Sequence, residues 1–120
     1  MQVVFGKNTA EQLKNNFTVL ELDTFMQEGL QEPITAYAVL AFEDLPLDEL
    51  SHLEHTVKLH NTMWVEYRAK RFKYCEDAME HLRGKWKGAL DSFYEDFGKR
   101  IAELKNTNLS EDWNGVIYKN

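Results

Sequence analysis

Three histidines and a glutamate lie close together near the middle of the chain, at a spacing that could bind a metal ion. The segment HLEHTVKLH contains His52, His55 and His60, and Glu49 precedes His52 by three residues. On a helix, Glu-x-x-His and histidines three residues apart can share a metal. A carboxylate-bridged di-iron site requires a second Glu-x-x-His, which the sequence lacks. His60 also falls on an apolar helical stripe, which favours a hydrogen-bonded core histidine, so a metal-binding helical enzyme is only the third hypothesis.

The single cysteine is the other candidate for chemistry. Cys75 lies near Asp77 and His81, but no further residue completes a nucleophilic site. A small residue at this point of a helix is typical of close helix packing. The sequence also lacks a glycine-rich phosphate loop, paired metal-binding cysteines and Gly-x-Ser-x-Gly. We therefore expect no enzyme activity, no metal and no cofactor.

Two segments mix basic and aromatic residues, as single-stranded nucleic-acid sites do. They are residues 68–74 (RAKRFKY) and residues 84–88 (GKWKG). The formal net charge of −6 opposes nucleic-acid binding. The charge is also uneven, because residues 15–57 carry nine acidic side chains and no Lys or Arg, whereas residues 58–105 carry eleven bases and eight acids. Nucleic acid is therefore not the expected partner.

Composition describes one ordinary domain. The chain has 120 residues, of which 43% are hydrophobic and 28% charged. One cysteine excludes an intrachain disulfide. The longest uncharged, mainly apolar run, residues 33–42, is too short to span a bilayer, and the N-terminus does not resemble a signal peptide. These features predict a cytoplasmic protein without a membrane partner.

The first third of the chain is expected to form a small β element. Val3-Val4-Phe5 before Gly6 predicts a strand, and Thr9 with Gln12 forms a capping box that opens a helix to about Asn15. Near-alternation of apolar and polar residues predicts a β-hairpin over residues 17–42, with its turn around residues 26–33. An alternative makes Pro33 the first residue of a helix.

From Leu47 the apolar period changes to three or four residues, which predicts helices. Asp48 is a plausible N-cap. Arg71 would interrupt the apolar stripe, so a break is expected near residues 69–72, and Gly84 and Gly88 mark another boundary. The last helix is expected to end at residues 106–108. The final WNGVIYK is either a short strand or an extended tail. The predicted fold is therefore α+β, with three packed helices after the β element.

The predicted hairpin contains Leu22, Asp23, Gly29, Pro33, Tyr37, Val39 and Leu40 at a fixed spacing. With this hairpin, the first 42 residues resemble the C-terminal end of a class III nucleotidyl (adenylate/guanylate) cyclase domain. That family ends in a strand, a short helix opened by Thr, and a hairpin with a characteristic residue spacing. Glu28 departs from the pattern, because the family usually has Lys before the glycine. The family's metal-binding, base-selecting and transition-state residues all precede the matching segment, so the resemblance carries over no catalytic residue.

The rest of the chain is similar to the tetratricopeptide-like helical tail that follows some bacterial cyclase domains. The sequence EDWNGV, residues 111–116, resembles the Trp-Asp-Gly tail of those proteins, with Asn114 in place of Asp. Only one repeat-like unit is visible, so the hairpin would have to supply its packing partner. We divide the single domain into a cyclase-end-like region (1–44), a helical region (45–106) and a tail (107–120).

Fifteen aromatic residues are many for so small a core, and aromatic side chains are enriched at protein interfaces. The leading hypothesis is a non-catalytic accessory protein that binds another protein or a second copy of itself. It would dock on, or mimic, the end of a nucleotidyl cyclase, or occupy a host protein as phage-type proteins do. The alternative is a C-terminal piece or subunit of a cyclase whose catalytic core is on another chain. The expected partner interface comprises Trp64, Arg68, Arg71, Trp86, Tyr94 and Trp113.

Overall fold

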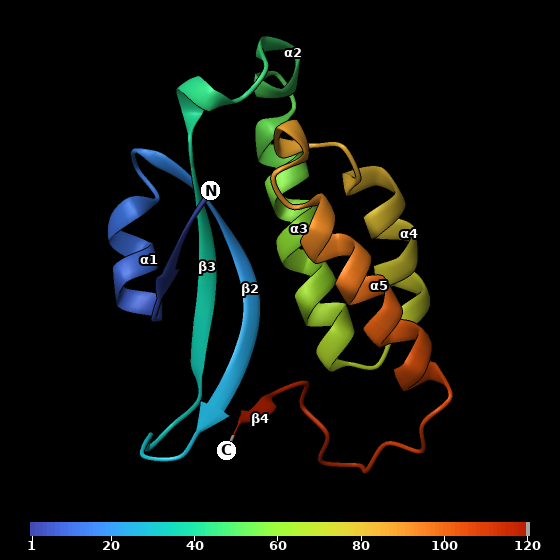
Figure 1. Cartoon of the computed structure of the whole chain (residues 1–120). Coiled ribbons are helices and arrows are strands. Elements are labelled where there is room, and N and C mark those ends of the chain that lie inside the picture. Colours follow the sequence, from blue (N-terminus) through green and yellow to red (C-terminus); the bar gives the residue numbers. More distant parts are fainter. Residues whose placement is uncertain (120) are drawn as a thin grey trace.

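A computed structural model, which describes residues 1–119, places a four-stranded mixed sheet beside a layer of helices (Figure 1). This arrangement confirms the α+β prediction. No helix within these residues is both long and apolar enough to cross a membrane. The elements in chain order are β1 (Gln2–Phe5), α1 (Lys7–Leu13), β2 (Phe17–Gln27), β3 (Ile34–Ala41), the 3₁₀ turn η1 (Phe42–Asp44), α2 (Leu47–Leu50), α3 (Leu53–Arg68), α4 (Phe72–Leu82), the 3₁₀ turn η2 (Trp86–Gly88), α5 (Asp91–Lys105) and β4 (Ile117–Lys119).

The sheet has the order β1-β3-β2-β4. The hairpin of β2 and β3 is confirmed, with Val19 opposite Val39, and β1 pairs antiparallel with β3. The helix alternative at Pro33 is wrong, because residues 34–41 pair with strands on both sides. Near its end the chain returns as β4, which pairs parallel with β2. Of the two alternatives for this segment, a short strand or an extended tail, residues 117–119 therefore form the strand.

The two faces of the sheet contact different helices. On one face, Ala10 of α1 packs with Val19 and Val39 in a small cluster. On the other face, Leu20 and Ala38 belong to the main core, which also contains the apolar side chains of α3, α4 and α5. The hairpin therefore supplies the packing partner that the helical part needs.

Several helix boundaries follow the predictions, and two caps do not. The break after α3 is confirmed, with Lys70 in the left-handed region (φ 64°) between α3 and α4. The Thr9 cap is wrong, because Gly6 (φ 95°) turns the chain out of β1 and α1 begins at Lys7. The Asp48 cap is also wrong, because α2 begins directly after Pro46 and Asp48 lies inside it.

Candidate protein-interaction surface

The outer edge of β1 is an uncovered part of the sheet. β1 ends the strand order, and its sequence QVVF contains no charged residue and no proline. Natural edge strands normally carry charges, prolines or bulges that discourage pairing with another chain. The register of β1 on β3 is regular from Gln2 to Phe5, so a bulge is absent there too. This edge therefore lacks those three protections, and a further strand could pair along its four residues.

The backbone of β1 presents unpaired groups at this edge. Gly6 donates its N–H to the carbonyl of Thr35 at 2.9 Å, which makes this pair hydrogen-bonded. Hydrogen-bonded and non-bonded pairs alternate along antiparallel strands. The N–H and C=O groups of Val3 and Phe5 therefore point away from β3, to the outer edge. An added strand would find its donors and acceptors at these two residues.

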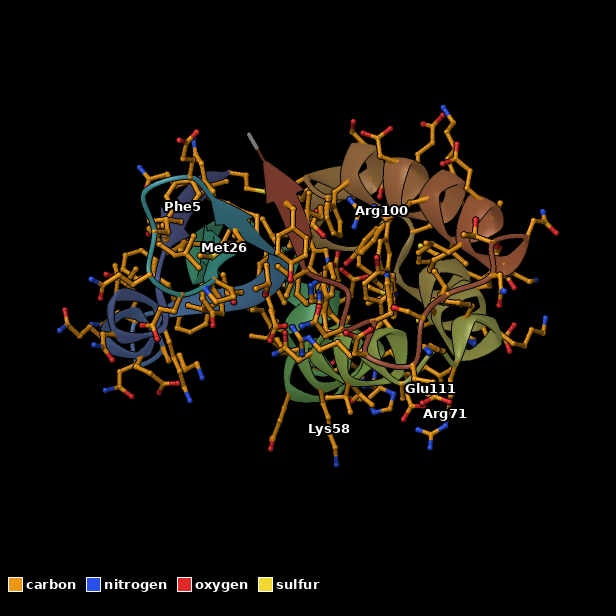
Figure 2. All side chains as sticks on the ribbon, turned by 90° about the horizontal axis from the view of Figure 1, so that it is seen from below. Phe5, Met26, Lys58, Arg71, Arg100 and Glu111 are labelled. Atoms are coloured by element: carbon orange, nitrogen blue, oxygen red, sulfur yellow. The ribbon has the colours of Figure 1, made fainter. Side chains whose placement is uncertain are left out.

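The side chains of the same two residues form an exposed apolar patch. Val3 is 42% exposed and Phe5 is 54% exposed, and Met1 beside them is 61% exposed. They lie on the same face as Ala36 and Ala38, but helices α3–α5 cover that face only over the neighbouring strands. Figure 2 shows Phe5 at the end of the molecule away from α4 and α5. We call Met1, Val3, Phe5 and the outer edge of β1 the β1 surface.

The predicted interface residues fall into two groups. Trp64, Trp86 and Tyr94 are no more than 2% exposed and belong to the main core, so the core holds these three rings, contrary to the expectation that fifteen aromatics are many for it. Arg68 and Arg71 are exposed. The three aromatic rings can be buried because the sheet enlarges the core, and because the rings of α3 and α5 pack directly on one another.

Trp113 has an intermediate position on the returning tail. Its ring makes edge contacts with Tyr67 at 5.2 Å and with Phe72 at 5.9 Å between ring centroids. Gly115 next to it has φ 79°, and a Cβ there would lie 2.8 Å from Cε2 of Tyr67. The tail is therefore packed closely on the α3–α4 pair, and a glycine is required for that approach.

A buried chain of hydrogen bonds links three of the candidate residues. Trp86 Nε1 donates to the Tyr94 hydroxyl at 2.9 Å, and this hydroxyl lies 2.9 Å from His60 Nδ1. His60 Nε2 lies 2.6 Å from the carbonyl oxygen of Glu21, which can only accept. His60 is therefore neutral with its proton on Nε2, and Tyr94 donates to Nδ1. Burial lowers the pKa of His60 to about 4, which agrees with this arrangement.

The metal and nucleophile candidates do not assemble into a site. Both ring nitrogens of His60 are already bonded, whereas His52 and His55 are exposed. Within residues 1–119, no three His, Cys, Asp or Glu side chains are grouped to hold a metal ion. Cys75 is buried, its Sγ lies 3.5 Å from the carbonyl oxygen of Met63, and burial raises its pKa to about 12. This thiol is a helix-packing residue, as its position predicted.

In the two basic–aromatic segments, most of the aromatic side chains are buried and the basic side chains lie at the surface. Tyr67, Phe72 and Trp86 are buried, so their rings are not available for stacking on bases. The bases around them form local contacts, such as Arg71 with Glu66 at 2.9 Å. These aromatic rings are therefore part of the core and not of a nucleic-acid-binding surface.

Val3 and Phe5 were predicted to lie in a strand but not on an exposed surface. Three consecutive apolar residues predict a strand but do not tell which of its faces is covered. The available signal was the lack of any charge in the first six residues, which is unusual for an exposed edge.

Comparison of the chain with protein-family models, curated proteins and solved structures finds no match.

Proposed function

We propose that this chain is a non-catalytic interaction module that extends the sheet of a partner protein through β1. The single observation that carries the proposal is the β1 surface, with its unpaired backbone groups and exposed apolar side chains at Val3 and Phe5. Strand addition is a recurrent mode of recognition, in which main-chain hydrogen bonds supply affinity and side-chain contacts supply specificity. Burying the exposed half of these two side chains would contribute about 2 kcal/mol.

The proposed partner is the catalytic core of a class III nucleotidyl cyclase on another chain. Two observations support this choice. The hairpin spacing of residues 22–40 resembles the end of such a domain, and residues 1–41 fold as strand, short helix and hairpin. In this proposal β1 adds to the open edge of the core's sheet. The chain then completes the domain without supplying a reacting group.

The test is reconstitution with a cyclase core that has been truncated before its final strand, helix and hairpin. We expect the two chains to elute together in size-exclusion chromatography and the mixture to convert ATP or GTP with Mn²⁺ faster than the core alone. A core that neither binds the chain nor gains activity would overturn the cyclase assignment. Product formed by the isolated chain would overturn its non-catalytic role.

A pair of variants connects this result to the β1 surface. The double substitution Val3→Lys with Phe5→Lys is expected to weaken binding roughly 30-fold, because it removes about 2 kcal/mol of apolar burial. Leu47→Lys on α2 changes an 85% exposed apolar side chain in the same way and should leave binding unchanged. If light scattering instead shows a homodimer that the double variant disrupts, then β1 pairs with a second copy and not with a cyclase core.

A further inference from the structure

A furrow runs along the outer edge of β2, on the opposite side of the sheet from β1. It consists of two adjoining hollows of about 360 Å³ and 440 Å³. The two hollows share Lys14, Val19 and Asn61, so they form one continuous depression between α1 and α3. The apolar end of the furrow is lined by Phe17, Thr18, Phe42, Leu53 and Val57.

A buried hydroxyl without a partner lines this furrow. Thr18 is only 4% exposed, and its Oγ1 is the one buried side-chain polar atom without a hydrogen bond in residues 1–119. A polar group left in this state destabilises a protein unless something binds it. Because Thr18 lines the apolar hollow, rotation of its side chain would bring the hydroxyl within reach of a molecule bound there.

The backbone of β2 presents further groups to the same furrow. Because residues of β3 alternate between β1 and β2, the N–H and C=O groups of Phe17, Val19 and Glu21 point to the outer edge of β2. At Glu21 the edge is already occupied, since Asn61 accepts from its N–H at 3.1 Å and Trp64 donates to its C=O at 2.8 Å. Within the described chain, Phe17 and Val19 have no comparable side-chain partners on α3. Two residues of strand edge are therefore open.

The charges at the other end of the furrow are positive on balance, with Lys7, Lys14 and Lys58 against Glu11 and Glu21. Glu11 pairs with Lys14 at 2.8 Å, and Glu21 pairs with Arg68. Lys7 and Lys58 line the same hollow and form no ion pair with any residue between 1 and 119. Lys58 projects from α3 into solvent (Figure 2). Glu54 lines the apolar end and, beside Lys58, a separate hollow. This end therefore favours a ligand with acidic side chains.

We propose that the furrow binds an extended segment of a partner protein, which adds to the edge of β2 at residues 17–19. The segment hydrogen-bonds to the outward backbone groups and to the Thr18 hydroxyl. Its acidic side chains lie near Lys7 and Lys58. An apolar side chain of the segment packs in the hollow formed by Phe42, Leu53 and Val57. This surface is separate from the β1 surface, because it occupies the opposite edge of the sheet.

The test begins with a displayed library of random peptides of about seven residues, selected on the full chain. We expect enrichment of peptides that combine apolar with acidic residues. Enrichment of basic peptides, or of none, would overturn the proposal. The affinity of one enriched peptide is then measured by fluorescence anisotropy on the chain and on its variants.

Two substitutions report on the two parts of the furrow. Thr18→Val keeps the side-chain shape and removes the unpartnered hydroxyl, so we expect unchanged or higher thermal stability and about 3- to 10-fold weaker peptide binding. Lys58→Glu should weaken binding about tenfold. The matched control Lys99→Glu on α5 should have no effect. If neither Thr18→Val nor Lys58→Glu changed the peptide affinity, the proposal would be overturned. Retained peptide binding by the Val3→Lys/Phe5→Lys variant would show that the furrow binds independently of β1.

Discussion

Glu21 is the residue at which the helices are tied to the sheet. Its N–H is bound by Asn61, its carbonyl accepts from Trp64 and His60, and its side chain pairs with Arg68, all from α3. The register of β2 on β3 shifts just after this residue. A strand edge at this point would expose unpaired backbone groups, so Asn61, His60 and Trp64 of one helix replace the missing neighbouring strand.

The neutral state of His60 makes stability depend on pH. The pKa of His60 is lowered from 6.5 to about 4 by burial, so between these values the unfolded chain binds a proton that the folded chain does not. The free energy of unfolding should therefore decrease as the pH falls below about 6.5, by about 2 kcal/mol at about pH 5. Urea denaturation at about pH 7 and at about pH 5 measures this loss of unfolding free energy.

The variant His60→Gln serves as the control for this prediction. Glutamine can still donate to the Glu21 carbonyl but does not titrate. The variant should be less stable than the parent at neutral pH and should lose less stability between about pH 7 and about pH 5. If both proteins lost the same amount, His60 would not be the group responsible.

Asp23 and Arg100 form the second link between β2 and the helices. Arg100 donates two hydrogen bonds to the carboxylate, at 2.6 and 2.9 Å, and the pair is about one-quarter exposed. A double-mutant cycle with Asp23→Asn and Arg100→Gln should give a coupling of about 1–2 kcal/mol, because the contact is bidentate and partly shielded. The exposed pair Lys99–Glu95, 3.6 Å apart, should give no measurable coupling in the same cycle. Equal coupling in both pairs would contradict this distinction.

At the scale of elements, the returning tail holds the helical layer to the sheet. Residues 106–116 cross from the end of α5 to β2, and Trp113 packs on α3 and α4 on the way. β4 then pairs with Phe25–Gln27, beside which no other strand lies on that side. The tail therefore joins elements from both ends of the chain.

Gly115→Ala should detach this tail. A Cβ there would lie 2.8 Å from Tyr67, and the backbone is left-handed with φ 79°. Gly29→Ala is the matched control, because Gly29 also has a positive φ (95°) but no atom within 4 Å of the added Cβ. Both variants should lose about 1 kcal/mol from backbone strain. Only Gly115→Ala should lose more and show faster amide hydrogen exchange in β4. Equal effects of the two substitutions would show that the close approach to Tyr67 is unimportant.

Much of the element structure could be predicted from local patterns. The alternation in residues 17–25 and 34–40 places the hairpin, and the charged Arg71 on an apolar stripe places the break between α3 and α4. The burial of Trp64, Trp86 and Tyr94 could not be predicted by counting aromatics, because it depends on how α3, α5 and the sheet meet. The β1 surface has the same cause, since only the tertiary arrangement decides which strand the helices leave uncovered.

At the scale of the molecule, the sheet is protected unequally at its two edges. The edge at β2 is partly occupied by α3 side chains and by β4, whereas the edge at β1 has neither. The helical layer packs on β2 and β3, whereas β1 lies on the side of β3 away from α3–α5 (Figure 1). The side chains of Val3 and Phe5 therefore remain exposed. A sheet with this shape would gain both hydrogen bonds and apolar burial from one more strand. We propose that a partner protein supplies that strand.

Amide hydrogen exchange tests this claim most directly, by comparing the free chain with its complex with the truncated cyclase core. The amides of Val3 and Phe5 point outward, so they should exchange rapidly in the free chain and become protected in the complex. The amide of Val4 faces β3 and should change little, which makes it the internal control. Failure to form a complex, or a complex that leaves Val3 and Phe5 unprotected, would contradict the proposed role of β1.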